Sequence, residues 1–208
     1  MLKKLLFIVA VVTGLLAIGQ GAMADPLPGV MLQEASDTSA PGQRRARVYL
    51  QEVTLDGWTA ELRGRVVAQV ARELRKRMPL DYVDVILVAA GTQSPRQNVI
   101  VAKADYAPDP SIIPFADKVW TVKASDVLLT KRQVVIANAW EKYREQFKDS
   151  DGFVEEDKLS AFLAKKLKLP LDEIGLPFVY PDQDIEPKEI NLGPDYLDVI
   201  AEAFRDIL

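Results

Sequence analysis

An acidic run between two predicted helices has the arrangement of a calcium-binding helix–loop–helix. With Gly152 aligned to the glycine at position six of such a loop, several neighbouring acids fall on ligand positions. Phe147 then occupies the first ligand position and Lys158 the twelfth, where calcium needs carboxylates. These two residues favour a plain turn whose acids stabilise the start of the next helix. The sequence therefore predicts no metal site, and the residues left as calcium candidates are Asp149, Asp151 and Glu155.

A second acidic run lies in a proline-rich stretch near the C-terminus. It contains Asp182, Asp184, Glu186 and Glu189 at nearly alternating positions. Such carboxylates could bind calcium or serve as an acid–base pair in hydrolysis. An acid–base pair needs one carboxyl whose pKa is raised by burial, whereas acids among prolines indicate exposure. We expect a solvated loop that wraps back over the body of the protein.

One side of a long predicted helix is basic. Arg65, Arg72, Arg75 and Lys76 fall on the side opposite its apolar stripe. Four such charges could bind an anionic partner, such as a lipid headgroup, peptidoglycan or an acidic protein surface. An ordinary solvated face, with Glu61 on the same side, is the alternative. These four basic residues are the candidate anionic-partner surface.

The composition excludes several kinds of catalysis. The 208 residues include no histidine and no cysteine. A Ser-His-Asp or Cys-His site, a histidine-bound metal, a disulfide or an iron–sulfur cluster therefore cannot form. The sequence also contains no glycine-rich phosphate loop and no serine-nucleophile motif. We therefore assign no catalytic residue, no cofactor-binding residue and no cofactor, and an enzymatic role is not favoured.

Residues 1–24 have the three parts of a secretory signal peptide. Lys3 and Lys4 precede an apolar run, and Ala22-Met23-Ala24 provides a small-residue cleavage site. The apolar run is shorter than the roughly 20 residues that a membrane-spanning helix needs. Cleavage would remove two lysines and no acids, which changes the net charge from −4 to −6. The sequence predicts a periplasmic protein, with secretion as the alternative, no transmembrane segment after cleavage and no nucleic-acid partner.

The periodicity of the remaining chain separates a linker from two structured parts. Prolines, glycines and small polar residues predict a flexible linker over 25–46. Residues 47–125 predict a β-α-β-β-β module whose helix has one wide apolar stripe. Its expected elements are strands at 47–54, 82–89, 98–105 and 119–124 and a helix at 59–78. The fold class is α+β, with a mainly antiparallel sheet and one long helix.

Residues 126–208 predict a three-helix segment that packs on the free face of this sheet. Helices are expected at 129–148, at 154–169 and after Pro194, with the acidic, proline-rich loop at 170–193. Thr130 and Gln133 fit a capping box at the start of the first of these helices. Because one helix covers only about 10 Å of a sheet, the second face needs the other helices as cover.

Part of the α/β module resembles a known family. The matching segments are Arg45-x-Arg47-Val48, Glu73-Leu74, Asp84-Val85-x-Leu87-x-Ala89-x-Gly91 and Ala102-Lys103-Ala104-Asp105-Tyr106-Ala107-Pro108. Over about residues 44–110 the chain resembles an uncharacterised bacterial family, a domain of unknown function. The resemblance implies the fold of the module and no activity.

The predicted signal peptide and the absence of the usual catalytic residue types favour a non-enzymatic binding or assembly component of the bacterial cell envelope. Its partner would be a protein or another envelope molecule. The alternative is a hydrolase that acts on an envelope glycan with carboxylates only. Two carboxyl groups about 5–10 Å apart in a concave pocket would favour the hydrolase. A flat basic or apolar patch would favour the binding protein.

Overall fold

The computed structural model describes residues 29–93, 99–175, 178–186, 201–202 and 205. The predicted signal peptide and most of the predicted terminal helix lie outside these residues. No helix in the described part of the chain is long and apolar enough to span a membrane.

The described residues form a six-stranded sheet in the order β1-β2-β3-β4-β5-β6. The strands are β1 (Val30–Asp37), β2 (Arg45–Glu52), β3 (Tyr82–Val88), β4 (Ile100–Tyr106), β5 (Trp120–Ala124) and β6 (Gln183–Asp184). Only β2 and β3 pair in parallel, and the other neighbours are antiparallel. The prediction of an α+β fold with a mainly antiparallel sheet is confirmed.

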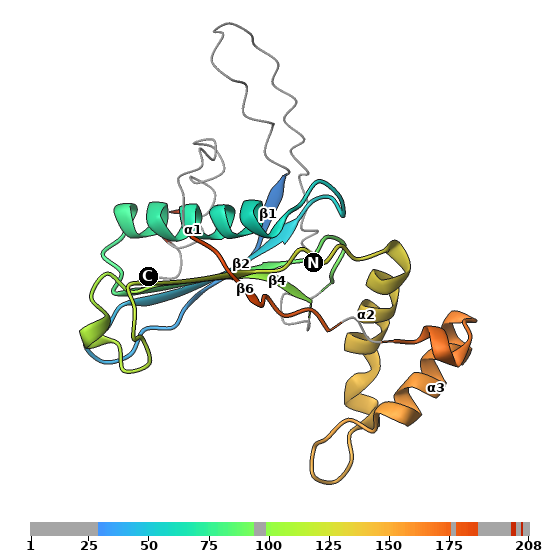
Figure 1. Cartoon of the computed structure of the whole chain (residues 1–208). Coiled ribbons are helices and arrows are strands. Elements are labelled where there is room, and N and C mark those ends of the chain that lie inside the picture. Colours follow the sequence, from blue (N-terminus) through green and yellow to red (C-terminus); the bar gives the residue numbers. More distant parts are fainter. Residues whose placement is uncertain (1–28, 94–98, 176–177, 187–200, 203–204, 206–208) are drawn as a thin grey trace, which may run out of the picture.

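Helix α1 (Ala60–Arg77) provides the crossover between the two parallel strands, which cannot be joined by a tight turn. Thr59 caps its start by accepting a hydrogen bond from the backbone N–H of Leu62, and the helix ends just before Pro79. The helix lies along one face of the sheet (Figure 1). Its apolar stripe, including Val66, Val70 and Leu74, is almost fully buried against the central strands, mainly β3, β4 and β5.

Strand β1 lies within the linker predicted over 25–46, so that prediction is wrong for the residues of this strand. Strand β1 pairs antiparallel with β2 along nearly its whole length. The register shifts between Leu32 and Glu34, so an extra residue interrupts the alternation of apolar and polar side chains. Because a strand is recognised from that alternation, the bulge removes the signal by which β1 could have been found.

Helices α2 (Lys131–Tyr143) and α3 (Glu156–Leu167) do not cover the second face of the sheet, contrary to the prediction for these two helices, and most of the predicted terminal helix lies outside the described residues. The two helices pack against each other and stand beyond one end of the sheet (Figure 1). Most of their buried apolar side chains form a separate small core that includes Ile136, Trp140, Leu159 and Leu163, whereas Val134 and Ala137 of α2 join the main core. Short 3₁₀ turns at Pro110–Ile112, Arg144–Phe147 and Leu171–Glu173 complete the described helices. The predicted capping box of Thr130 and Gln133 is present at the start of α2.

The segment after the helical pair returns to the sheet. Val179 forms a parallel bridge with Val99, and β6 then pairs with the end of β5. Ile185 continues across α1 at Gly64, where a Cβ in place of the glycine hydrogen would come within 2.5 Å of the Ile185 side chain. The described part of the predicted loop at 170–193 therefore wraps back over the body, as expected, and also extends the sheet.

Candidate functional site

The sheet face opposite α1 carries two rows of mostly polar side chains that run across the strands. Because residues paired between neighbouring strands point to the same face, the register defines each row directly. The first row contains Arg47, Asp84, Asp105 and Thr121, from β2 to β5. The second contains Tyr49, Ile86, Lys103, Lys123 and Asp184, from β2 to β6. We call these nine residues the polar face.

This polarity explains why no helix among the described residues covers the second face. Val48, Val85 and Ala104, which alternate with residues of the polar face along the same strands, point toward α1 and are fully buried there. The opposite side chains are mostly charged or hydroxylated and can meet water without a large cost. The sheet therefore has one core face and one open face.

Asp84 is the most enclosed charged group of the polar face. Its side chain is only 1% exposed, and its Oδ2 accepts a hydrogen bond of 2.6 Å from Arg47 Nε. Lys103 Nζ lies 3.7 Å from the other oxygen, Oδ1. Within the described residues, that buried oxygen has no hydrogen-bond partner. A buried carboxylate oxygen without a donor is costly, so it marks a place where an external donor would be stabilising.

Asp105 lies directly opposite Asp84 on the neighbouring strand. Lys103 Nζ lies 3.0 Å from Asp105 Oδ1, so this ammonium group contacts both carboxylates. The hydroxyl of Tyr82 donates a hydrogen bond to the same Asp105 oxygen. Two like charges in directly opposite positions repel, and Lys103 together with Arg47 compensates that repulsion.

Burial sets the electrostatics of this cluster. It raises the pKa of Asp84 above the ordinary value, and the neighbouring Asp105 acts in the same direction, whereas Lys103 and Arg47 act against them. Burial also raises the pKa of Tyr82, and the hydrogen bond to Asp105 adds to this effect because it stabilises the protonated phenol. Tyr82 is therefore a donor throughout the physiological pH range.

Two adjoining hollows lie over the polar face. The first, of about 340 Å³, is lined by Arg47, Asp84, Ile86, Ile100, Lys103, Asp105, Thr121, Lys123, Tyr180 and Pro181. The second, of about 200 Å³, is lined by Tyr82, Lys103, Asp105, Ala107, Phe115, Ala116, Asp117, Lys118 and Thr121. Because both share Lys103, Asp105 and Thr121, they form one depression, which we call the sheet-face groove.

The sequence patterns did not single out this site, although they contain a partial signal for it. Asp84, Lys103, Asp105 and Lys123 interrupt three predicted strands at alternating positions, which places their side chains on one face of each strand. Which strands are neighbours, and in what register, does not follow from the sequence. Tyr180 lies in a segment that follows the helical pair, and nothing in the sequence of that segment indicates that Tyr180 joins the same site.

The calcium candidates serve the local structure of a tight turn. Asp149 Oδ1 accepts hydrogen bonds of 2.9 Å from the backbone N–H groups of Asp151 and Phe153. Glu155 forms an ion pair with Lys158, which occupies the place of the missing twelfth ligand. The described residues contain no group of three or more acids, histidines or cysteines that could hold a metal ion.

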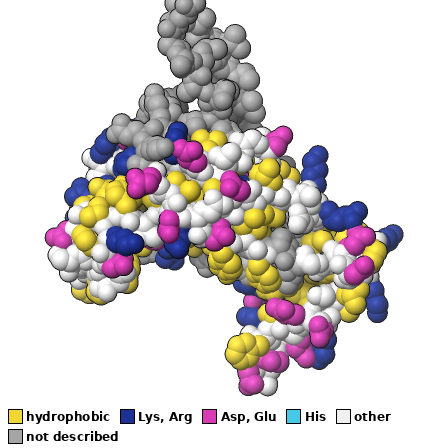
Figure 2. Space-filling view, in the orientation of Figure 1, with side chains coloured by type: hydrophobic (Ala, Val, Ile, Leu, Met, Phe, Trp, Pro, Cys, Tyr) yellow, Lys and Arg dark blue, Asp and Glu magenta, His cyan; other side chains and the backbone are white. Residues whose placement is uncertain are grey.

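The basic residues of the candidate anionic-partner surface make separate contacts with neighbouring side chains. Arg65 pairs with Glu61, and Lys76 Nζ lies 2.7 Å from Glu73 Oε1. The guanidinium of Arg72 lies 5.2 Å from the ring centre of Trp120. Arg75 is half-buried beside them. On the side of the molecule seen in Figure 2, basic and acidic side chains are interspersed and do not gather into a region of one sign.

The late acidic run contributes one carboxylate to the polar face. Asp184 lies 3.8 Å from Lys123 Nζ and is strongly exposed. Asp182 and Glu186 are also exposed, and Glu189 lies outside the described residues. The structure therefore does not bring the described members of this run together as a set of ligands.

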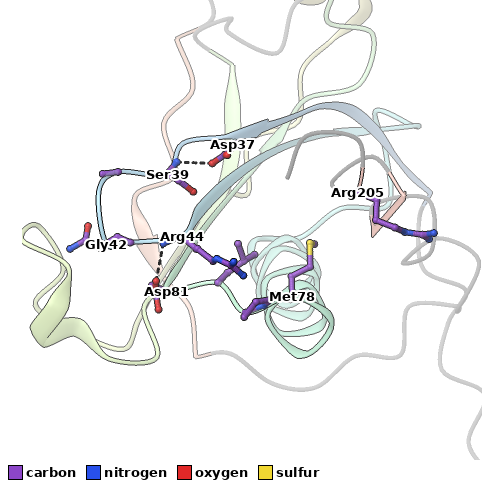
Figure 3. A pocket seen from close by; sticks show the side chains of 11 residues that line it. Asp37, Ser39, Gly42, Arg44, Met78, Asp81 and Arg205 are labelled. Carbon is purple, nitrogen blue, oxygen red and sulfur yellow. Dashed lines mark hydrogen bonds between the residues drawn. The ribbon is translucent and has the colours of Figure 1, made fainter.

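A larger hollow of about 820 Å³ lies where α1 ends. Figure 3 shows Arg44, Met78 and Arg205 around it. Its two carboxylates are engaged in the turns that form its wall. Asp37 accepts a hydrogen bond of 2.7 Å from the backbone of Ser39, and Asp81 accepts one of 2.8 Å from the backbone of Arg44. Among its described lining residues, this hollow therefore lacks the unsatisfied buried carboxylate that distinguishes the sheet-face groove.

These features define an α+β protein in which, among the described residues, helix α1 covers one face of the sheet and the other face is polar. The chain belongs to a family described as a domain of unknown function, DUF4875, whose sequence profile matches residues 31–179. The predicted resemblance is thus confirmed, and the match extends beyond 44–110 to include β1 and the helical pair.

One solved structure supports the fold. A crystal structure of a DUF487 family protein from Desulfovibrio piger ATCC 29098 is 24% identical to this chain, with a TM-score of 0.60. The similarity covers 81% of this chain and 97% of that one. No curated protein matches this chain.

Proposed function

We propose that this protein is an exported, non-enzymatic binding component of the bacterial cell envelope and that the sheet-face groove is its binding site. The predicted signal peptide at 1–24 supports the compartment, which is the periplasm. The observation that carries the site is Asp84, a buried residue on the wall of the groove whose Oδ1 has no hydrogen-bond donor among the described residues. A bound molecule that supplies this donor would relieve an electrostatic cost already present in the fold.

The arrangement of charges favours binding over catalysis. Lys103 lies within 4 Å of both Asp84 and Asp105, so each carboxylate already faces a cation. Arg47 holds the remaining oxygen of Asp84. Groups fixed in this way present a rigid pattern of donors and acceptors, which is what a binding site needs to orient its ligand.

A carboxylate-dependent hydrolase of an envelope glycan is the second candidate. Asp84 and Asp105 are directly opposite each other in a concave site, and burial raises the pKa of Asp84, as a general acid requires. Incubation of the protein with isolated bacterial cell walls distinguishes the two functions. New reducing ends that disappear in Asp84→Asn would establish the hydrolase, whereas retention without cleavage supports the binding component.

Binding is tested by co-sedimentation of the mature protein with isolated cell walls and, separately, with inner-membrane vesicles. Lys123→Glu reverses one charge on the groove while leaving Asp84 and its partners in place. Lys76→Glu makes the same change on an exposed lysine of α1 and is the matched control. We expect retention of the wild type and the control on one of the two fractions, and at least a tenfold loss for Lys123→Glu.

Equal retention of Lys123→Glu and the wild type would exclude the groove as the binding site. If Lys76→Glu alone lost retention, the candidate anionic-partner surface on α1 would be the binding surface instead. Circular dichroism of each variant verifies that the comparison is between folded proteins.

A further inference from the structure

We infer that the ligand of the sheet-face groove is an uncharged glycan segment at least two sugar rings long. This inference rests on the proposed function and specifies the chemical class of ligand at the same site. Three features of the groove support it: its charge balance, its alternation of donors and acceptors, and an exposed aromatic ring in each hollow.

The charges of the polar face between β2 and β6 cancel. Its cations are Arg47, Lys103 and Lys123, and its anions are Asp84, Asp105 and Asp184. The wall of the groove adds one further charge of each sign, Lys118 and Asp117. A strongly anionic ligand would meet carboxylates next to every cation, and a cationic ligand would meet the reverse. Such a balanced surface selects against ligands of high net charge and favours a neutral, polar molecule.

Donors and acceptors alternate over a few ångströms. Lys103 Nζ lies 3.0 Å from Asp105 Oδ1 and 3.7 Å from Asp84 Oδ1. A ligand group that binds here meets a donor and an acceptor at once. A hydroxyl group can donate to the Asp105 carboxylate and accept from Lys103 simultaneously, and Thr121 offers a further hydroxyl nearby. Adjacent hydroxyls on a sugar ring match this pattern.

An exposed aromatic ring lies in each hollow. Tyr180 lines the first hollow and is 61% exposed, and Phe115 lines the second and is 59% exposed. Both rings are positioned by structure around them. Tyr180 follows Val179, which is bridged to Val99, and Phe115 packs edge-on against Tyr82 with a ring-centre distance of 5.0 Å.

A sugar ring has a face of C–H bonds and an edge of hydroxyl groups. The C–H face packs on the electron-rich face of an aromatic ring, while the hydroxyl edge reaches polar side chains. In the sheet-face groove, the two rings stand in separate hollows that share Lys103, Asp105 and Thr121. One sugar ring stacks on one aromatic ring at a time, so contact with both Tyr180 and Phe115 requires at least two linked sugars.

The test is calorimetric titration of the mature protein with two neutral probes, a tetramer of β-1,4-linked N-acetylglucosamine and maltotetraose. We expect one tetramer to bind at least ten times more tightly than its own monomer. Tyr180→Ala and Phe115→Ala should each weaken tetramer binding at least tenfold. Phe153→Ala removes an even more exposed aromatic ring outside the groove and should change nothing.

Several results would overturn the inference. These are no binding of either tetramer at millimolar concentration, equal affinity for monomer and tetramer, or unchanged affinity in Tyr180→Ala and Phe115→Ala. Binding of an extended alanine tetrapeptide at the groove in place of both glycans would also overturn it. If cell-wall or vesicle retention still depended on Lys123, the proposed function would stand while the glycan assignment fell.

Discussion

Arg63 of α1 and Glu52 of β2 form an ion pair in which each side chain is only 1% exposed. Arg63 Nε lies 2.7 Å from Glu52 Oε1, and the same guanidinium donates to the carbonyls of Ser125 and Val127. The pair thus connects the helix, the end of β2 and the segment that follows β5. This ion pair therefore stabilises the end of the sheet that leads into α2 and α3.

Removing one partner of this ion pair should be strongly destabilising. Arg63→Met leaves the buried Glu52 carboxylate and two carbonyl groups without their donor, which should cost about 3–5 kcal/mol. Urea denaturation measures this loss. Lys76→Met, at an ion pair on the solvent side of the same helix, should cost less than about 1 kcal/mol. Similar losses for the two variants would show that Arg63 is not a structural anchor.

Burial of Asp84 should appear in the pH dependence of stability. Because the folded-state pKa of Asp84 lies above its ordinary value of 3.8, the folded protein binds this proton more tightly than the unfolded chain does. This contribution to stability is full below pH 3.8 and is lost as the pH rises through the folded-state pKa. The unfolding free energy of the wild type minus that of Asp84→Asn should therefore fall with rising pH.

Asp37 provides a control of opposite sign for the Asp84 experiment. Hydrogen bonds from Ser39 lower the pKa of Asp37, so its contribution is present above the ordinary value and is lost as the pH falls through the lowered one. The difference between wild type and Asp37→Asn should rise with pH. Chemical denaturation from about pH 3 to pH 7 measures both differences. Curves of the same direction would contradict the assigned environment of Asp84.

The contact between Gly64 and Ile185 should make a methyl group on the helix intolerable. A Cβ at position 64 would approach the Ile185 side chain to 2.5 Å, so Gly64→Ala should destabilise by about 1–3 kcal/mol despite the better helix propensity of alanine. Ile185→Ala in the same chain should recover part of the loss. Gly175→Ala, where no described atom lies within 4 Å of the added carbon, is the control. Thermal melts that rank the two glycine variants equally would refute the close packing.

Millimolar calcium should leave the melting temperature unchanged. The oxygen of Asp149 that a cation would use already accepts two backbone hydrogen bonds, and Lys158 stands at the position of the bidentate ligand. Saturation at a hundred times the dissociation constant would stabilise the protein by about 2.7 kcal/mol, which a thermal melt resolves. An upward shift that Asp149→Ala abolishes would reinstate the calcium site.

The exported form should begin at Asp25. Ala22 and Ala24 occupy the small-residue positions before the expected cleavage site. N-terminal sequencing of the protein recovered from a periplasmic fraction measures this directly. Ala24→Leu should block processing and leave the precursor at the membrane. A protein recovered with Met1 intact from the cytoplasm would contradict both the signal peptide and the proposed compartment.

The sequence by itself determined the elements with strong periodicity. The helix predicted at 59–78 is α1, and the strands predicted at 47–54, 82–89, 98–105 and 119–124 are β2 to β5 with ends shifted by a few residues. Each of these elements buries an apolar face, so the spacing of apolar residues within the segment itself is enough to predict the element. The absence of histidine and cysteine also determined which chemistries are excluded.

Only the tertiary structure decided how those faces meet. Asp84 and Asp105 are 21 positions apart, and Tyr180 is a further 75 positions along, so no local pattern relates them. The register of β3 against β4 sets the two carboxylates opposite each other, and the bridge of Val179 to Val99 brings Tyr180 to the same groove. Register and strand order arise from the packing of the whole sheet on α1. A site built across four strands is therefore a property of the folded sheet, because each strand supplies only a few of its groups and none supplies the set.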